Sequence, residues 1–517
     1  MNELPQNKLS MSSQTIDDTV FIDFGTSNTT VRVLRNDGIV NPVACVQSHN
    51  CIPSVAMVDD SGITIPDYIT RQPTKAFVYN VKRILGKSRD QFEDSEISEE
   101  LFHSSLELDT NGKPYFGVSY GRPNNRQKKS IYPEEIAREI LKKCKEKAEK
   151  SLDHPVDKCV MSIPNYFFDT SKEALRQAAK DAGLEVLYFV KEPTAAGINY
   201  IHSNNAGSLG IRDGELALVF DFGGGTLDLT AMRRKKNNFV VEAQGGNPNL
   251  GGNNIDQSIC QWALKKYEDS YGVKPLGSNA DSVRYKRNYS MLLNYCRECK
   301  EMLSSQSSFD IPFSNLGVDN DITLTQKEFN NAIMQGDILE SAEEALQPIL
   351  NEYGREIDHI ILCGGSSNIP IIQSFLQDLI PGVPIHKPMD PQMLVVEGIA
   401  TIVRKDLQFD EVFESSLGFR IGGQFSSHLE PGTRIPSTQN KYFEFSRDGR
   451  DRMIEVSRLV NGEWHKEGTL DCSQIRVRGS PRIQINITCE KDTSVTYNVY
   501  YSGKCIDTLK LRPWSFC

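Results

Sequence analysis

Two short segments place an acidic residue beside a tight turn, an arrangement suited to phosphate and metal chemistry. In residues 216–232, LALVFDFGGGTLDLTAM, an apolar run stops at Asp221 and the glycines Gly223, Gly224 and Gly225 follow. Glycine has no Cβ, so the backbone can turn tightly and bring its N–H groups close to a ligand. Apolar and polar residues then alternate, which indicates a strand. The unit is therefore strand, turn, strand, whereas Walker and Rossmann loops open a helix.

The same frame occurs near the start of the chain. In residues 19–34, TVFIDFGTSNTTVRVL, an apolar run ends at Asp23 before a turn and a second alternating segment. The turn contains Gly25, Thr26, Ser27 and Asn28. Two such units about two hundred residues apart indicate an internal duplication with two matching lobes. If the turns face each other, their N–H groups and carboxylates could surround one polyphosphate with a hydrated Mg²⁺.

Composition limits the class of protein. The chain has 517 residues, 38% of them hydrophobic and 24% charged, which predicts about two to four globular domains. A net charge of −10 gives no general attraction to nucleic acid or to an anionic membrane. No apolar run approaches the ~20 residues of a membrane span. Residues 1–19 are mostly polar and lack the apolar core of a signal peptide, so we expect a flexible tail.

The twelve cysteines show no disulfide-like spacing. Cys296 and Cys299 have the spacing of half a zinc site, but a second pair is absent from the sequence. We expect buried free thiols and a reducing, cytoplasmic location. Any redox role of this pair is left open.

The intervening sequence predicts mixed helices and strands. Residues 132–150 have apolar residues at helical spacing behind Pro133, and residues 157–167 form a short buried strand. A second helix is expected to stop at Gly183, and a third to begin just after the Glu192-Pro193 step. Residues 357–376 indicate a strand, a double glycine and a helix starting near Pro370.

Past about Lys405 the helical spacing is replaced by short alternating runs. Turn signals occur at Asn461-Gly462 and Ser502-Gly503. The alternating apolar residues include Ile483, Ile485, Ile487, Val495, Tyr497 and Val499. This pattern predicts a separate, mostly antiparallel β domain.

The order of these motifs resembles the heat-shock protein 70 (DnaK-like) chaperone family, within the actin-like ATPase superfold. The two hairpins, FIDFGTSN and FDFGGGTLD, resemble its phosphate loops, and VKRILGK resembles the segment with its catalytic lysine. IPNYFFD and KEPTAAGINY resemble its connecting segments, and GNPNLGGNNID its second-lobe loop. CGGSSNIP resembles the adenosine loop and DPQMLVVEGIA the closing helix. The resemblance extends from Val20 to about Gly503.

The resemblance implies an α/β fold, with a two-lobed actin-like ATPase domain followed by an antiparallel β-sandwich. The expected tail is 1–19 and the ATPase domain 20–404, with lobe I at 20–210 plus 387–404 and lobe II at 211–386. The expected linker is 405–413, and the expected sandwich is 414–517.

The resemblance also implies roles for individual residues in ATP hydrolysis, with ATP or ADP, Mg²⁺ and K⁺ as cofactors. Asp23 and Asp221 would support hydrated Mg²⁺, and Lys82 would neutralise charge near the γ-phosphate. Glu192 and Asp228 would orient the waters of the metal or the attacking water, so Asp228 joins Asp23 and Asp221 as an expected metal residue. Thr226 would offer a hydroxyl to phosphate and water, and it is expected to be catalytic together with Asp23, Lys82, Glu192 and Asp221. The remaining implied nucleotide contacts are Gly25, Thr26, Ser27, Asn28, Gly223, Gly224, Gly225, Thr226, Gly252, Arg297, Lys300, Ser304, Gly364, Gly365, Ser366, Asn368 and Asp390.

Several positions depart from the family pattern. The adenine-contacting helix of the family usually has Glu-x-x-Lys-Arg-x-x-Ser, whereas CRECKEMLSS exchanges the acid and the arginine. Glu301 therefore replaces the stacking arginine, and we expect Arg297, one turn earlier, to substitute. Asn368 also stands where the family usually has arginine. Nucleotide affinity is thus less certain than hydrolysis.

The partner surface and linker differ too. Tyr188 and Lys191 occupy positions where members that recruit J-domains usually carry arginine and asparagine, so a J-domain partner is left open. The linker segment DLQFDEVF interrupts its apolar residues with three acids, which weakens the expected docking. Those apolar residues are Leu407, Phe409, Val412 and Phe413.

The β domain resembles the family's sandwich for extended peptides, and the helical lid that usually follows is expected to be missing because the sequence ends at Cys517. We therefore predict a slow ATPase of chaperone type that binds extended apolar peptide or an unfolded client. Nucleic acid and membrane are not expected partners. The alternatives are a nucleotide switch or exchange factor for another chaperone, and a small-molecule kinase of the same superfold.

Overall fold

The computed structural model divides the chain into two compact units. Residues 1–232 and 245–407 belong to the first, and residues 233–244 and 408–516 to the second. The structure describes residues 19–34, 40–42, 51–67, 74–93, 102, 104–122, 125–165, 167, 169–203, 210–235, 238–280, 283–388, 390–405, 409–412, 417–421, 424–429, 434–435, 437–444, 453–460, 463–473, 475, 482–489 and 495–511.

Lobe I of the first unit contains a mixed sheet with the order β12-β11-β1-β2-β3, to which β4 is joined through β2. Its first hairpin pairs β1 with β2 antiparallel, and β1 also pairs with β11 in parallel. The predicted strand–turn–strand unit is confirmed. The strands are β1 (Thr19–Phe24), β2 (Asn28–Leu34), β3 (Val40–Pro42), β4 (Cys51–Pro53), β11 (Lys158–Ile163) and β12 (Glu185–Lys191).

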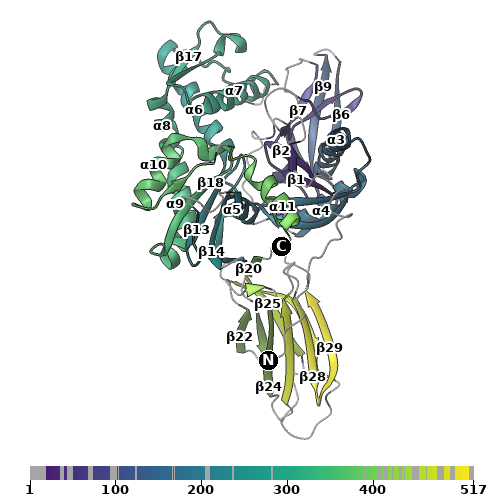
Figure 1. The fold of residues 1–517 in the computed structure, drawn as a ribbon. Helices are drawn as coiled ribbons and strands as arrows, with labels where there is room; N and C mark the ends of the chain where they lie inside the picture. The colour runs from purple at the N-terminus through teal and green to yellow at the C-terminus, as the bar shows by residue number, and fades with distance from the viewer. Residues whose placement is uncertain are drawn as a thin grey trace. The chain divides into compact units, whose positions relative to one another are not determined.

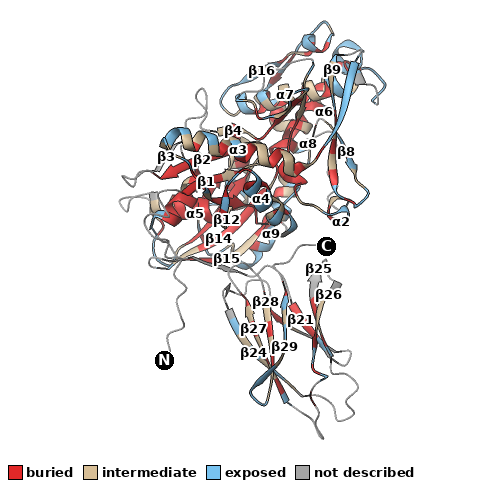
Figure 2. Ribbon diagram, turned by 90° about the vertical axis from the view of Figure 1, so that its right-hand side faces the viewer, coloured by how far each residue is buried: buried red, intermediate tan, exposed pale blue. Residues whose placement is uncertain are grey.

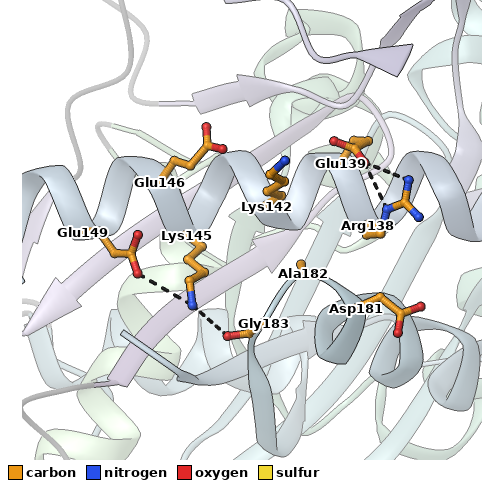
Figure 3. Close-up of a pocket in the computed structure, with 9 residues that line it drawn as sticks. All are labelled: Arg138, Glu139, Lys142, Lys145, Glu146, Glu149, Asp181, Ala182 and Gly183. Atoms are coloured by element: carbon orange, nitrogen blue, oxygen red, sulfur yellow. Dashed lines mark hydrogen bonds and ion pairs between the residues drawn. The ribbon is translucent and has the colours of Figure 1, made fainter. Parts of the chain in front are cut away.

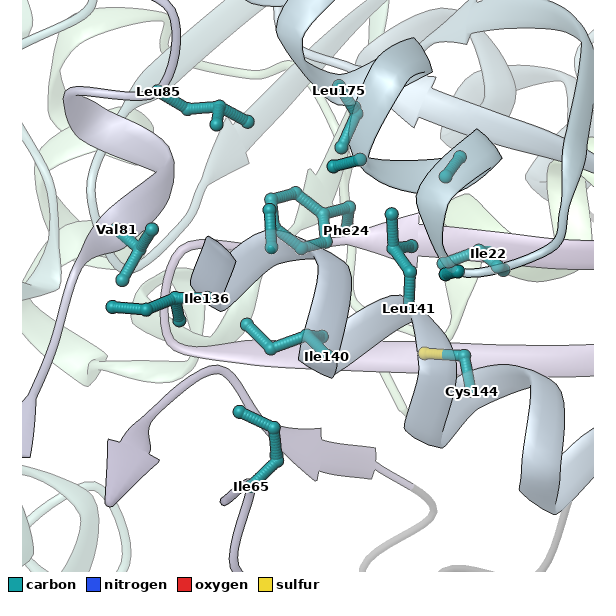
Figure 4. Packing of buried hydrophobic residues seen from close by; sticks show 14 of the residues in the cluster. Ile22, Phe24, Ile65, Val81, Leu85, Ile136, Ile140, Leu141, Cys144 and Leu175 are labelled. Carbon is teal, nitrogen blue, oxygen red and sulfur yellow. The ribbon is translucent and has the colours of Figure 1, made fainter. Parts of the chain in front are cut away.

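Apolar packing holds this hairpin in place. Helix α3 (Pro133–Leu152) begins at the predicted proline, and its Ile136 and Ile140 lie in one buried cluster with Phe24 of β1 (Figure 4). Val81 of the 3₁₀ helix η1 (Val81–Arg83) packs into the same cluster. Because α3, β1 and η1 share this core, the first turn and the basic residues of η1 are held in a fixed arrangement.

The neighbouring helices largely agree with the sequence. Helix α4 (Asp169–Asp181) ends before Gly183, whose φ of +77° is readily adopted by glycine. Helix α5 (Glu192–Ser203) begins at Glu192, one residue before the proline rather than after it. Proline is well tolerated in the first turn, where its missing N–H would have no helical partner.

Lobe II repeats the strand–turn–strand motif. Its strands follow the order β19-β18-β13-β14, and β13 pairs in parallel with β18. The sequence therefore predicted the second hairpin correctly. The elements are β13 (Leu216–Phe222), β14 (Leu227–Lys235), α6 (Gly252–Tyr271), α7 (Val283–Met302), β18 (Ile357–Cys363), η4 (Gly365–Asn368), α10 (Pro370–Leu379) and β19 (Ile385–His386) (Figure 1). Helix α11 (Leu394–Lys405) instead packs against α5, β1, β2 and β11 of lobe I.

Smaller sheets and helices complete the first unit. Strand β10 lies at the edge of the sheet β10-β9-β8, and separate sheets contain β6-β5-β7 and β16-β17. These elements are β5 (Ala56–Asp59), β6 (Gly62–Thr64), β7 (Ala76–Val78), α2 (Arg89–Glu93), β8 (Ser105–Leu108), β9 (Pro114–Arg122), β10 (Asn125–Ile131), β16 (Ser308–Ile311), η3 (Phe313–Leu316), β17 (Ile322–Thr325), α8 (Gln326–Gln335) and α9 (Ile338–Tyr353).

The second unit contains two four-stranded antiparallel sheets, β22-β21-β25-β26 and β24-β27-β28-β29, as the alternating sequence predicted. In β27 and β28, apolar residues at alternate positions are buried in the common core, and the residues between them are more exposed (Figure 2). The strands are β21 (Leu417–Ile421), β22 (Gln424–Leu429), β24 (Ser437–Glu444), β25 (Met453–Val460), β26 (Glu463–Asp471), β27 (Arg482–Cys489), β28 (Val495–Tyr501) and β29 (Lys504–Leu511).

Part of the expected linker forms strand β20 (Phe409–Val412). Its backbone pairs in parallel with β15 (Asn238–Asn247) and antiparallel with β23 (Arg434–Ile435). The side chains of the four apolar linker residues lie outside the described part of the structure, as do the turn at residues 461–462 and residues 1–18 of the expected tail. Thr19, the last residue of that expected tail, is instead buried and begins β1. Within the described residues, no helix is long and apolar enough to cross a membrane.

Candidate phosphate and metal site

Lys82 and Glu192 form a buried ion pair inside lobe I. Lys82 lies in η1, and Glu192 is the first residue of α5. The Lys82 Nζ donates to Glu192 Oε1 at 2.5 Å, and the two residues are only 7% and 8% exposed. Water therefore screens this charge weakly, so the ammonium exerts a strong field on a neighbouring anion.

Asp23 lies on the first hairpin and is held by Ser162 of β11. The Ser162 hydroxyl donates to Asp23 Oδ1 at 2.6 Å. Burial raises the pKa of Asp23 to about 7, and the nearby Glu192 carboxylate adds to this increase. The charge of Lys82 and the Ser162 hydrogen bond act in the opposite direction.

The second hairpin contributes Asp221 and Asp228. Burial raises the pKa of Asp221 well above its usual range, and the charge of Glu192 adds to the effect. Burial also raises the pKa of Asp228 to about 7, although the Thr226 hydroxyl and the Asn165 N–H donate to its carboxylate. The Asn165 N–H reaches Asp228 Oδ1 at 2.8 Å. Both hairpins thus direct acids to one buried region.

This region contains more carboxylates than the one basic residue described so far, Lys82. Four carboxylates influence one another electrostatically, and Lys82 is the cation paired among them. A divalent cation would relieve this excess of negative charge. In the part of the chain that the structure describes, no three acidic, histidine or cysteine side chains converge closely enough to coordinate a metal. The excess of carboxylates fits a hydrated Mg²⁺, which binds carboxylates largely through its waters.

The two glycine turns contact each other, so side chains in one turn restrict which residues fit in the other. A Cβ added to Gly224 would lie 2.2 Å from Ser27 Oγ, and one added to Gly225 would lie 2.8 Å from Thr26 Cγ2. Neither position leaves room for a side chain. On the first turn, Ser54 Oγ donates to Gly25 O at 2.8 Å. The duplicated turns therefore meet face to face, as the sequence predicted.

A second layer of hydrogen bonds supports the lobe II turn. The Gly252 N–H donates to Gly223 O at 3.0 Å, and the Ser366 hydroxyl donates to the same oxygen at 2.9 Å. Gly364 has a φ of +75°, and an added Cβ would lie 2.4 Å from the backbone oxygen of Phe222. The predicted second-lobe loop and adenosine loop thus pack directly against the phosphate turn.

Helix α7 places its basic residues beside this loop. Lys300 Nζ donates to Gly252 O at 2.9 Å and pairs with Asp256 Oδ1 at 2.8 Å. Arg297 Nη2 donates to Asn253 Oδ1 at 3.3 Å, and its guanidinium lies 5.6 Å from the Tyr79 ring centroid. Arg297 therefore already has partners from both lobes, and its contact with adenine stays a prediction.

The hydrogen bonds described for the other predicted nucleotide contacts are made to residues nearby in the sequence. The Ser304 hydroxyl donates to Lys300 O at 3.1 Å within α7. Asn368 is half-buried at the end of η4, the short helix that begins at Gly365. Asp390 is exposed, and its Oδ1 accepts from the Gln392 N–H at 3.2 Å. Asn28 is half-buried at the start of β2.

The sequence analysis missed four residues that support the site: Arg83, Ser162, Asn165 and Asp256. Asn165 and Asp256 lie within the quoted motifs IPNYFFD and GNPNLGGNNID, so these motifs contained the signal. Arg83 follows Lys82 directly, and its Nη2 donates to Gly225 O at 2.8 Å. The role of Ser162 depends on the parallel pairing of β1 with β11, which no local pattern specifies.

Two further features lie away from this site. A cavity of about 760 Å³ is present between α3 and the end of α4, lined by residues of both charges such as Arg138, Lys142 and Glu146 (Figure 3). None of the predicted site residues lines it. Cys296 and Cys299 are free and buried, as the sequence predicted.

Comparison with known proteins agrees with this arrangement. The family model described as Hsp70 protein matches residues 19–500. The chain is 28% identical over 495 residues to the chaperone protein dnaK3 of Synechococcus elongatus, with 90% of this chain and 62% of that protein covered. It is also 28% identical to the chaperone protein DnaK 1 of a Synechococcus species, again with 90% and 62% covered. The chain thus spans less than two thirds of the length of these relatives.

The family model covers most of the chain, from the first hairpin to β28 of the β-sandwich. The fold is accordingly a two-lobed actin-like ATPase domain followed by a β-sandwich. The buried lysine, the paired turns and their carboxylates occupy the motifs on which the resemblance was based. We conclude that this chain belongs to the Hsp70 family.

Proposed function

We propose that the chain is an ATP-dependent chaperone of the Hsp70 type that hydrolyses ATP slowly and couples nucleotide state to the binding of extended polypeptide. The observation that supports this most strongly is the buried Lys82–Glu192 pair beside two facing glycine turns with three aspartates. The reaction would convert ATP and water to ADP and inorganic phosphate. A cytoplasmic location is part of the same proposal.

Each polar group has a proposed task in phosphoryl transfer. The ammonium of Lys82 would stabilise charge on the γ-phosphate as the bond to ADP breaks. Glu192, which already accepts from Lys82, would orient the attacking water together with Asp228. Asp23 and Asp221 would hold Mg²⁺ through its waters, and the ion would neutralise phosphate charge when bound. K⁺ remains a proposed second cation.

The nucleotide base would lie between α7 and the adenosine loop. Lys300 and Ser366 converge on Gly252, where an added Cβ would lie 2.9 Å from Lys300 Nζ and 2.5 Å from Ser366 Oγ. This proximity supports one continuous binding surface from the phosphate turn to α7. Arg297 would contact the base from the neighbouring helical turn, while Glu301 provides no stacking plane.

The β-sandwich would bind an extended apolar segment or an unfolded client. A sandwich can bind such a segment through main-chain hydrogen bonds and a few apolar pockets. Tyr188 and Lys191, on β12, depart from the family pattern for J-domain recruitment, so this proposal includes no J-domain partner. The chaperones named above are similar to this chain, but their clients are not assigned to it.

The test is hydrolysis of ATP by the purified full-length chain with Mg²⁺. We expect slow release of phosphate from the wild type and at least a hundredfold loss in Lys82→Ala, since its charge acts mainly in the transition state. Nucleotide binding by calorimetry should persist in the variant. Lys113→Ala, which removes a partly exposed lysine of the same lobe, is the matched control.

If the wild type hydrolyses no more ATP than Lys82→Ala but still binds it, the proposed ATPase is wrong. The chain would then act as a nucleotide switch or as an exchange factor for another chaperone. Phosphate transfer to members of a sugar panel, without stimulation by peptide, would instead establish a kinase.

A further inference from the structure

Arg83 is a buried cation that forms no ion pair with an acidic residue in the part of the chain that the structure describes. Four lysine and arginine residues in the described ranges are less than one-tenth exposed, and Arg83, at 8%, is one of them. The other three form ion pairs: Arg32 with Glu397, Lys82 with Glu192, and Lys300 with Asp256. Among the described residues, the Arg83 side chain forms one hydrogen bond, from Nη2 to Gly225 O at 2.8 Å.

The Arg83 guanidinium therefore retains unused capacity for hydrogen bonding. Its Nε is buried and has no hydrogen-bond partner among the described residues. Burial lowers the pKa of Arg83 to about 10, so the side chain stays positively charged at neutral pH. A buried charge with an unpaired N–H is costly unless an anion completes its contacts.

The location of Arg83 indicates which anion this would be. The carbonyl that it contacts and the N–H of Thr226 belong to the same peptide group and point in opposite directions. Arg83 therefore lies on one side of the second turn, and the Thr226 N–H points to the opposite side. A phosphate leaving the reaction region would remain close to this turn while moving toward Arg83.

Lys87 brings a second cation to the same segment. Burial lowers the pKa of Lys87 to about 8, and the positive charge of Arg83 contributes to this. Gly86, between them in sequence, has a φ of +68°, and an added Cβ would lie 2.5 Å from Thr170 O. Val81 and Leu85 anchor the segment in the apolar core (Figure 4). The two like charges are thus held near each other by packing, although they repel.

We propose that Arg83 and Lys87 form a binding site for inorganic phosphate on the outer side of the second glycine turn, where the product of hydrolysis is held before release. This inference rests on the proposed ATPase function for the source of the phosphate. The site itself requires only a tetrahedral oxyanion, because a guanidinium offers several N–H donors in a fixed fork.

The experiment titrates inorganic phosphate into the full-length chain by calorimetry, with and without saturating ADP and Mg²⁺. We expect the wild type to bind phosphate and Arg83→Gln to bind it at least tenfold more weakly. Arg83→Lys keeps the charge and should lose less affinity. The matched control is Arg126→Gln, an exposed arginine on β10, which should bind phosphate as the wild type does.

Unfolding by denaturant separates this role from a structural one. If Arg83 serves an anion, Arg83→Met should unfold at the same or a higher denaturant concentration in phosphate-free buffer, because a buried unpaired charge is removed. Added phosphate should stabilise the wild type but not this variant. A clear loss of stability in phosphate-free buffer would make Arg83 a structural residue and overturn the inference.

The phosphate titration and the ATPase assay together distinguish this inference from the proposed function. Equal phosphate affinity in the wild type and Arg83→Gln, or no phosphate binding by the wild type, would overturn the anion site even if ATP is hydrolysed. Loss of affinity in Arg83→Gln together with no ATP hydrolysis by the wild type would retain the anion site and reject the ATPase.

Discussion

At the scale of single residues, the charge balance of the buried site determines what it can bind. Asp221 and Asp228 are buried and Asp23 is half-buried, and the charges of Asp23 and Asp228 raise the pKa of Asp221, while Lys82 is already paired with Glu192. Such a group of acids is unfavourable without a cation. The same region attracts a phosphate only when metal and lysine offset the acids, so metal and nucleotide are expected to bind together.

A second, partly buried polar cluster, at the start of the lobe II strands, gives a prediction for pH. His359 Nε2 lies 3.0 Å from Glu215 Oε2, and its Nδ1 lies 2.9 Å from His386 Nε2. Burial and the neighbouring His359 lower the pKa of His386 below 6.5. The Tyr200 ring packs beside it, with centroids 5.3 Å apart. Protonation of His386 is therefore disfavoured in the folded state.

The sign of the effect follows from proton binding. Just below pH 6.5 the unfolded chain binds more protons at this position than the folded chain, so folding stability falls as the pH is lowered. We expect His386→Gln, which cannot titrate, to lose less stability between pH 7.5 and pH 5.5 than the wild type. Denaturant unfolding of both proteins at the two pH values measures this. An identical loss in both would remove His386 as the source.

The sequence could predict the role of a site residue when the signal lies in a short motif, but not when its partner lies far away in the sequence. Asp23, Asp221 and Lys82 stand in short motifs, so their types and spacing were sufficient to nominate them. The partners of Arg83 and His359 could not be predicted in this way. Arg83 contacts a glycine 142 residues away, and His359 contacts a glutamate 144 residues away. Such pairs depend on the arrangement of strands, not on any local pattern.

At the scale of elements, most helices and strands were predicted from the spacing of apolar residues. Alternation specified β27 and β28, and helical spacing specified α3 together with the residues that it buries. The order of strands within each sheet was not available from periodicity. The placement of η1 beside the second turn likewise depends on packing against α3 and β1.

The sandwich offers a direct test of this alternation. Ile485 is fully buried on β27, whereas its neighbour Gln484 faces outward and donates to Asn440 Oδ1 at 2.9 Å. We expect Ile485→Ala to destabilise the second unit by about 2–5 kcal/mol, because it removes buried methyl groups and leaves a cavity. Gln484→Ala, the matched control, should cost less than about 1 kcal/mol.

Amide hydrogen exchange, monitored in peptides from β27 and β28, reports the stability of this unit within the full-length chain. Faster exchange in Ile485→Ala than in Gln484→Ala is the expected result. Equal exchange in both variants would mean that β27 does not contribute its alternate residues to the core as described.

At the scale of the whole molecule, the account requires the nucleotide-binding unit to influence the sandwich. The backbone of the linker region forms β20 and pairs with β15, so this segment has a defined partner in the second unit. A nucleotide can alter peptide affinity only if it favours one of two states with different contacts. The apolar linker residues are proposed to make this difference, with Phe409 and Phe413 as the largest.

The measurement that tests the central proposal most directly is release of a fluorescent apolar peptide from the full-length chain by stopped-flow mixing. We expect weak binding, rapid release, and a rate that is faster with ATP than with ADP, since affinity changes are expressed mainly in dissociation. A double variant with Phe409→Asp and Phe413→Asp should release the peptide at one rate in both nucleotides. Release that is the same in ATP and ADP for the wild type, or no binding of the peptide, would contradict a chaperone that couples nucleotide to polypeptide.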